Sequence, residues 1–256
     1  MAANFESVEQ AIKDLKISKL IEQRQAPTLH RNAISTRDFV AAPATPTTAD
    51  VIAGGSLLTS TTYKIKVTCI NDNGETTAPT AASQATSADA GNAHCIDVII
   101  TRVAGAKKYG VYLSVDADPL YKEVVDDAGS GTTQTNRITA TGTGVVAPTV
   151  NTAWSEPSLS AGIDCVGYEG VDFDCKLTLT GTTPVIELTP IHYNSFDAQW
   201  YAGESIFFGA PSYQYTIYRQ KPRIRVLAKG ALVFLQIRTL TGTTPTFTLS
   251  AWASKF

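Results

Sequence analysis

The chain begins with a helical pattern of apolar residues. Within residues 4–24, apolar side chains recur at intervals of three and four, which places them on one face of a helix. The residues of this face are Phe5, Val8, Ile12 and Leu15. Pro27 ends the predicted helix, because the residue before a proline avoids α-helical geometry. Two interpretations stay open: a helix packed on its own domain, or an arm that docks on a neighbouring subunit through these four candidate contact residues.

The next segment, residues 26–50, shows neither a helical nor an alternating pattern. It ends in AAPATPTTAD, where Pro43 and Pro46 favour extended, polyproline-like geometry. We therefore predict a linker or the start of a strand. Residues 1–42 together are predicted to form an N-terminal helix and an extended arm, which would reach about 3.3 Å per residue where it is extended.

Beyond residue 50 the pattern is that of strands and turns. In TYKIKVTCIN at 62–71, apolar and polar residues alternate, as in an antiparallel strand with one buried face. The letters NDNGET that follow suit a hairpin turn with Asn73 and Gly74 at its centre. Further short alternating segments with turn residues between them indicate sandwich folds. The predicted fold class is all-β, with β-sandwich domains at 43–150 and 151–256 after the helix and arm.

One segment, TLTGTTP, occurs at 178–184 and again at 239–245, and each copy is followed by an alternating run. In both copies a strand pattern leads into a glycine, which allows a positive φ angle, and a proline then begins the next strand. We therefore predict two equivalent hairpins in the second sandwich. A phosphate-binding loop is excluded, because it needs Lys-Ser/Thr after its second glycine and then a helix.

Composition and charge exclude several classes of protein. The chain has 256 residues, is 43% hydrophobic and carries a net charge of −2, without the basic surplus of a general nucleic-acid binder. The densest basic stretch, RQKPRIRVLAK at 219–229, is interleaved with apolar residues and is interpreted as a strand, with an anion-binding face as the less favoured alternative. No segment reaches the roughly 18 apolar residues of a membrane helix, and no secretory signal is recognisable. We expect neither nucleic acid nor membrane as a partner.

The residues that could carry chemistry form no known active-site pattern. The four cysteines are predicted to be free thiols of a protein made in a reducing cytoplasm, with a Cys165–Cys175 disulfide as the alternative. The histidines, His30, His94 and His192, are far apart and no CxxC pair is present, so we expect no zinc site. Motifs of serine hydrolases, zinc proteases and dinucleotide-binding enzymes are absent. The predictions are no enzyme activity and no catalytic, cofactor or metal site.

Residues 54–114 resemble a known family. The two segments that carry the resemblance are GGSLLTSTTYKIKVTCINDNGETTAPT and CIDVIITRVAGAKKYGVYLS. They resemble the fibronectin-type-III or immunoglobulin-like modules of tailed-bacteriophage virion proteins, in the order of a circularly permuted module. Arg102 stands near the place of the usual tryptophan, so the core packing there must differ. The matching residues are Gly55, Leu57, Tyr63, Val67, Asn71, Gly74, Glu75, Thr76, Gly105, Ala106, Tyr109, Val111 and Tyr112.

The resemblance implies a fold for each domain. It implies an immunoglobulin-like or fibronectin-III-like sandwich at 43–150. The block at 151–256 resembles a domain that recurs in phage structural proteins, and a jelly-roll-like sandwich is expected there. The implied function is a structural virion subunit: a head decoration or cement protein that binds the shell through its N-terminal arm, or else a tail, neck or baseplate protein.

The implied partners follow from that function. They are other virion proteins, namely major capsid or tail subunits, and further copies of the chain on the particle, and the implied location is the virion. A second class of function is a binding module for a glycan or protein of the host surface. Aromatic residues are the candidates for such contacts: Tyr193, Trp200, Tyr201, Tyr213 and Tyr215.

Overall fold

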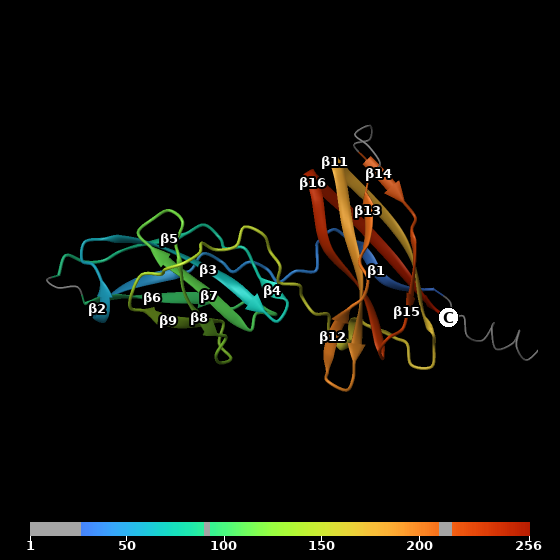
Figure 1. The fold of residues 1–256 in the computed structure, drawn as a ribbon, viewed down its shortest axis with the longest axis horizontal. Coiled ribbons are helices and arrows are strands. Elements are labelled where there is room, and N and C mark those ends of the chain that lie inside the picture. The colour runs from blue at the N-terminus through green and yellow to red at the C-terminus, as the bar shows by residue number, and fades with distance from the viewer. Residues whose placement is uncertain (1–26, 90–92, 210–216) are drawn as a thin grey trace, which may run out of the picture. The chain divides into compact units, whose positions relative to one another are not determined.

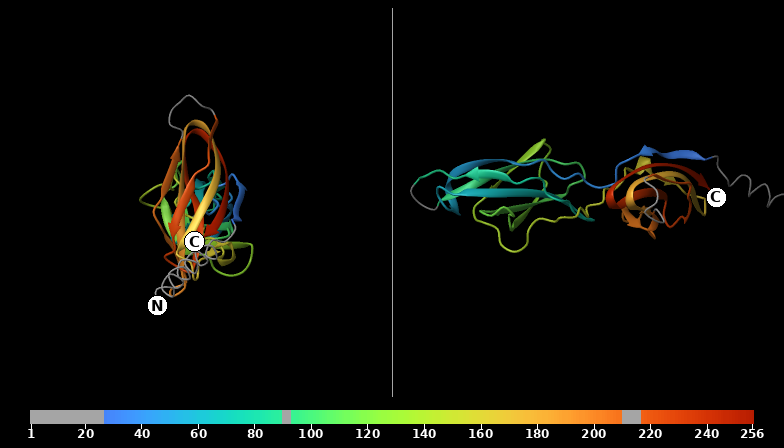
Figure 2. Two further views of the ribbon diagram at one scale, coloured as in Figure 1. Left: turned by 90° about the vertical axis from the view of Figure 1, so that its right-hand side faces the viewer. Right: turned by 90° about the horizontal axis from the view of Figure 1, so that it is seen from above.

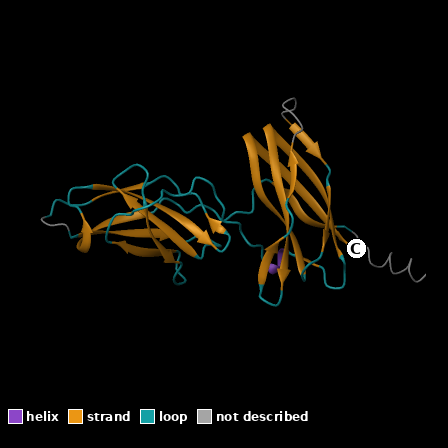
Figure 3. Cartoon of the chain, viewed as in Figure 1, coloured by secondary structure: helices purple, strands orange, loops and turns teal. Residues whose placement is uncertain are grey.

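The computed structural model describes residues 27–89, 93–209 and 217–256. Within these ranges the regular structure consists of sixteen strands and one short 3₁₀ turn, η1 (Leu159–Ala161), so the prediction of an all-β protein is confirmed (Figure 3). No helix in the described part of the chain is long and apolar enough to cross a membrane. The predicted N-terminal helix and its candidate contacts, Phe5, Val8, Ile12 and Leu15, lie outside the described residues.

The chain divides into two compact units at Phe39 and Ser155. Residues 39–155 form the first, which we call the inserted sandwich. Residues 27–38 and 156–256 form the second, which we call the C-terminal unit. Strand β1 (Thr28–Ile34) belongs to the C-terminal unit, because it pairs antiparallel with the last strand, β16 (Leu232–Lys255). Of the two predicted alternatives, a linker or the start of a strand, the structure shows a strand for this segment, and its backbone groups find partners more than 200 residues away, which no local pattern reveals.

The inserted sandwich consists of two antiparallel sheets that share one core (Figure 1). One sheet has the order β2–β6–β9, and the other has the order β4–β3–β7–β8 with β5 also paired to β3. The alternation predicted at 62–71 is confirmed, since Ile65 and Val67 face the core and Lys64 and Lys66 do not. The strands are β2 (Thr47–Leu57), β3 (Thr62–Asn71), β4 (Gly74–Glu75), β5 (Ala82–Ala85), β6 (His94–Thr101), β7 (Lys108–Ser114), β8 (Tyr121–Asp126) and β9 (Thr133–Ile138).

The hairpin after β3 differs from its prediction. Asn71 pairs with Gly74, so Asp72 and Asn73 are the central residues of the turn. The Oδ1 atom of Asn71 accepts hydrogen bonds from the N–H groups of Asn73 and Gly74, at 3.0 and 3.1 Å. A Cβ atom on Gly74 would lie 2.6 Å from the carbonyl oxygen of Thr152. The glycine is therefore needed for close packing and not for the centre of the turn.

The C-terminal unit is one sheet built on two long strands, β11 (Gly170–Asn194) and β16, which pair antiparallel along most of their length. On the other edge of β11, β15 and β14 pair with its first half and β13 and β12 with its second half. Strand β10 pairs with the start of β16. The short strands are β10 (Ile163–Asp164), β12 (Gln199–Ala202), β13 (Ile206–Gly209), β14 (Ile217–Gln220) and β15 (Arg223–Leu227).

The repeated TLTGTTP segments lie inside β11 and β16, so the prediction of two hairpins is wrong. The copies are 61 positions apart, from 178 to 239, and they pair with each other. Thr182 lies opposite Thr243, Thr180 opposite Thr246, and Val185 opposite Thr241. Exchanging the two copies maps the Thr182–Thr243 pair onto itself and the other two pairs onto each other, which makes this part of the sheet two-fold symmetric.

Each copy is an irregular point in its strand. Register shifts flank Thr182 on both sides. Gly181 and Gly242 have φ angles of +103° and +123°, and a Cβ atom on either would lie 2.8 or 2.7 Å from a carbonyl oxygen of the other copy. Such a position favours glycine, and bulges of this kind bend a strand. The motif was predicted to end one strand and begin the next, whereas it bends two strands that continue.

The bend is visible in the contacts of β1. Its residues run beside Ala251 near the end of β16, yet the Nε2 atom of His30 accepts the N–H of Leu235, near the start of the same strand, at 3.2 Å. A straight strand would place residues 235 and 251 about 50 Å apart. The two halves of the sheet therefore face each other, and from above the strands of this unit surround a common centre (Figure 2).

The core of the C-terminal unit lies between these halves. It contains Phe173 and Leu188 from opposite halves of β11, and Leu249 from β16. His30 of β1 packs against Phe173 and Phe234, with ring centres 5.2 and 4.9 Å apart. Burial, together with the neighbouring Arg31, lowers the pKa of His30 to about 4, so the ring is neutral at pH 7 and can accept its hydrogen bond. Strand β1 thus supplies part of the core.

Candidate functional site

The residues singled out for their chemistry lie in separate places. The four cysteines are buried free thiols, and Cys165 and Cys175 are not joined. Among residues 27–89, 93–209 and 217–256, no three metal-ligating side chains come together. Two of the histidines, however, belong to polar arrangements that could have a function. His94 lies in a network of the inserted sandwich, and His192 lines a pocket of the C-terminal unit.

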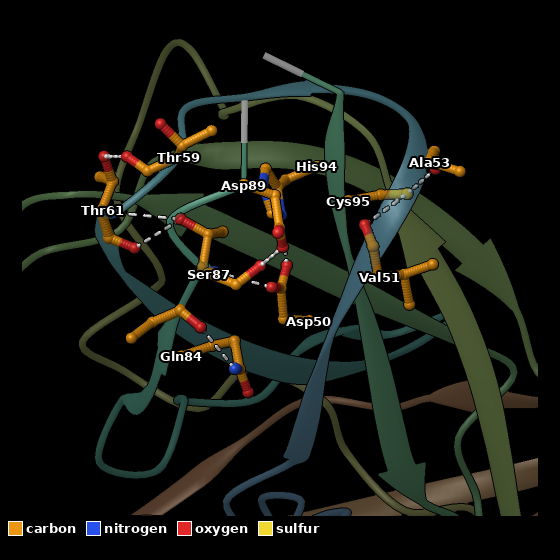
Figure 4. A network of polar contacts seen from close by, with 12 residues as sticks. Asp50, Val51, Ala53, Thr59, Thr61, Gln84, Ser87, Asp89, His94 and Cys95 are labelled. Atoms are coloured by element: carbon orange, nitrogen blue, oxygen red, sulfur yellow. Dashed lines mark hydrogen bonds and ion pairs between the residues drawn. The ribbon is translucent and has the colours of Figure 1, made fainter. Parts of the chain in front are cut away.

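The network joins β2 to β6. The Oδ1 atom of Asp50 lies 2.8 Å from Nδ1 of His94, and its Oδ2 atom accepts the N–H of Ser87 at 2.8 Å (Figure 4). His94 is only 1% exposed. Burial opposes the ionisation of Asp50, but the hydrogen bonds from Ser87 and His94 outweigh it and leave the pKa of Asp50 below its ordinary value. Asp50 is therefore an ionised group of β2 that is held by contacts to Ser87 and His94.

This network has the residue types of a Ser-His-Asp triad without its geometry. The hydroxyl of Ser87 donates to Asp89 at 2.6 Å and not to His94 (Figure 4). The Nε2 atom of His94 is buried and has no hydrogen bond within the described residues. A general base must lie within hydrogen-bond reach of the proton that it abstracts. What the geometry does provide is a polar connection from β2, through Asp50, to both β6 and Ser87.

The pocket lies where the two halves of the bent sheet meet. It has a volume of about 220 Å³, and its apolar wall comes from Pro190 in the second half of β11, Ile206 of β13, and Val226 and Leu227 of β15. Strand β15 pairs with the first half of β11, so the bend at the TLTGTTP segments brings these residues to one place. The pocket is thus a product of the bend, which explains why the sequence did not predict it.

His192 presents one ring nitrogen to this pocket. Its side chain is 6% exposed, and its Nδ1 atom accepts a long hydrogen bond of 3.4 Å from the N–H of Lys229. The neutral ring therefore carries its proton on Nε2, which has no partner in the described part of the chain. Gly203 leaves room there, because a Cβ atom on it would lie 3.2 Å from Nε2. Burial and the charge of Lys229 lower the pKa of His192.

Charged groups line the pocket as well. Arg225 forms a two-pronged ion pair with Asp172, with both contacts at 2.8 Å, and its guanidinium lies over the ring of Phe256. Glu204 and Lys229 also line the pocket, and neither has an ion pair within the described residues. The charge of Arg225 is thus balanced, while Glu204 and Lys229 can still interact with a ligand.

The predicted aromatic contacts are only partly surface residues. Tyr193 and Trp200 pack on each other with ring centres 5.3 Å apart, and Tyr201 is 51% exposed. Tyr213 and Tyr215 lie outside the described residues. Sequence reasoning missed Phe196, which is 99% exposed in the turn between β11 and β12. The turn residues around it in the segment NSFDAQ were the available signal.

Comparison with known proteins identified no relative: no family model, no curated protein and no solved structure matches this chain.

Proposed function

We propose that the protein is a structural subunit of a tailed-bacteriophage virion, in the first place a decoration or cement protein of the head. The observation that carries the proposal is the resemblance of residues 54–114 to modules of such virion proteins. The resembling residues include Val67 and Val111, which pair across β3 and β7, and Tyr63 and Tyr109, which lie in the same core. The residues that carry the resemblance are thus the ones that build one sandwich.

The way in which this sandwich is inserted also supports a modular subunit. Its first and last residues lie together: Phe39 and Trp154 form a β-bridge with ring centres 4.3 Å apart, and the N–H of Val40 donates to the carbonyl of Ala153 at 2.8 Å. A domain whose ends meet can be inserted into another without disturbing it. A projecting module added to a shell-binding unit is the arrangement that a decoration protein needs.

The shell contact is proposed for the N-terminal residues before β1, with Phe5, Val8, Ile12 and Leu15 as its apolar face. Repeated on a symmetric shell, weak contacts of this kind add up through avidity. A tail, neck or baseplate position is the alternative within the same class. A host-surface-binding module is the alternative outside it, and the exposed rings of Phe196 and Tyr201 favour it.

The test is a quantitative mass-spectrometric analysis of density-purified particles from a lysate that contains the chain. We expect the chain to co-purify with particles in a copy number comparable to that of the major capsid protein. A few copies per particle would move the assignment to the tail or baseplate. Complete absence from particles would overturn the proposal.

A further inference from the structure

The pocket at His192 combines three chemical features in one cavity. One lining residue, His192, offers the Nε2–H of a side chain that is more than nine-tenths buried. Lys229 provides a cation and Glu204 an acceptor of hydrogen bonds. The wall formed by Val226 and Leu227 is apolar. The Nε2–H of His192 has no partner in the described part of the chain and lies next to Gly203, another residue that lines the pocket, so a ligand oxygen can accept a hydrogen bond from it there.

The balance of charge narrows the class of ligand. Arg225 is neutralised by Asp172, and the charges of Lys229 and Glu204 cancel. A doubly charged phosphate would meet the carboxylate of Glu204 without enough cations to compensate. A monoanion that also carries hydroxyl groups fits better, because its carboxylate can reach Lys229 and His192 while a hydroxyl donates to Glu204.

We propose that this pocket binds a sugar acid, a monosaccharide with one carboxylate, whose C–H groups pack on the apolar wall. The carboxylate accepts from His192 Nε2 and pairs with Lys229, and a ring hydroxyl donates to Glu204. The basic stretch at 219–229, whose anion-binding interpretation was the less favoured one, supplies Arg225 and Lys229 to this site. The inference stands apart from the proposed virion role, since it concerns a ligand of the C-terminal unit whatever particle or partner the protein serves.

The affinity of the pocket for the sugar acid should depend on the protonation of His192 and therefore on pH. His192 is neutral at pH 7 because its pKa is lowered, and a bound carboxylate favours its protonated form. The other charged groups that line the pocket are Glu204, Lys229 and Arg225, which is paired with Asp172. Affinity for the acid should therefore rise as the pH falls below about 7.

The experiment is a titration of the full chain with sodium glucuronate, followed by NMR of the histidine rings. We expect saturable shifts of the His192 signals, with a Kd of about 1 mM or below. Glucose, which lacks the carboxylate, and acetate, which lacks the ring, should bind at least about tenfold more weakly. A glucuronate-terminated disaccharide distinguishes a free acid from the end of a glycan. No saturable shift at about 10 mM glucuronate, or equal binding of glucose, would overturn the proposal.

Two variants and one control assign the effect to the pocket. Lys229→Gln should weaken glucuronate binding roughly threefold, as loss of a partly exposed ion pair does. His192→Phe should weaken it about tenfold, because the donor to a charged oxygen is lost. Lys176→Gln, at an exposed position of β11 away from the pocket, should change nothing. Since His192→Phe can impair folding, the decisive comparison is Lys229→Gln with Lys176→Gln: equal affinities would contradict the site.

Discussion

The two units bury their cores by different means. In the inserted sandwich, short strands such as β3 and β7 pair in two separate sheets, and each strand follows a local alternation of apolar and polar residues. In the C-terminal unit, two strands of about 25 residues are bent at the same repeated segment, and a strand from the other end of the unit's sequence, β1, completes the core. The first core can be recognised from local patterns, whereas the second depends on contacts between distant segments.

This difference also separates the two histidine sites. The network of Asp50 and His94 holds strands together and keeps the Nε2 of His94 away from solvent. The pocket at His192 exists because the bent sheet brings β15 to the second half of β11. A bend that closes one sheet on itself leaves an opening where its halves meet, and two stacked sheets have no such junction. We therefore expect ligand binding in the C-terminal unit and mechanical stability in the inserted sandwich.

The largest effect should come from deleting residues 1–38. The C-terminal unit should then unfold, because β1 pairs with β16 and its His30 fills the core between Phe173 and Phe234, while the inserted sandwich should stay folded. Pulsed alkylation with mass spectrometry measures this, with Cys165 and Cys175 becoming reactive and Cys69 and Cys95 staying protected.

The matched control for this deletion removes only residues 1–26 and keeps β1. Protection of all four cysteines in the longer deletion would show that β1 is dispensable. The core of the C-terminal unit would then not depend on a distant segment, and the difference drawn between the two units would be wrong.

The next largest effect should come from Gly181→Ala. The new Cβ atom would lie 2.8 Å from a carbonyl oxygen of the other TLTGTTP copy at a positive φ angle, so we expect a loss of about 3 kcal/mol in the free energy of unfolding. Gly167→Ala is the control: its φ is also positive, at +82°, but the space around it is open, and about 1 kcal/mol is expected. Urea denaturation measures both, and equal losses would mean that the close approach of the two copies does not require glycine.

A smaller effect is expected from Asp50→Asn in the inserted sandwich. The pKa of Asp50 is lower in the folded than in the unfolded state, so its charge stabilises the fold above the unfolded value, about 3.9, and this contribution is lost as the pH falls through the folded value. The variant should be about 1 kcal/mol less stable at pH 7 and closer to the original protein at pH 3. Asp89→Asn, which leaves the Asp50–His94 contact intact, is the comparison. If the difference in stability between Asp50→Asn and the original protein is the same at both pH values, the charge of the carboxylate is excluded as its source.

The smallest effect is expected for alkylation of the cysteines when the native protein is treated with a thiol reagent at pH 8. Burial, with a further contribution from Asp174, raises the pKa of Cys175 to about 12, and burial raises the pKa of Cys165 to about 11. The reactive thiolate is therefore rare in the folded state, and alkylation should be very slow, whereas all four cysteines should react in denaturant. Rapid labelling of the native chain would show that a unit opens far more often than its core suggests.

Some properties of this protein follow from its sequence alone. The all-β class and the inward face of β3 could be predicted, because side chains of a strand alternate between its two faces and neighbouring letters carry that signal. The glycine of TLTGTTP was likewise recognised as a position for positive φ. Local conformational preference is a property of a few adjacent residues, so it can be recognised in the sequence.

Only the tertiary structure decided what these local elements do together. It paired the segment predicted as a linker or strand start with β16, as strand β1, and it showed that the two predicted hairpins are paired bends of β11 and β16. It also joined Asp50 to His94, which are 44 positions apart, and His192 to Lys229, which are 37 apart. The physical reason is that the hydrogen-bonding groups of a strand edge or a buried ring can pair with any complementary group that the folded chain brings near. The sequence pattern around each residue does not specify that group.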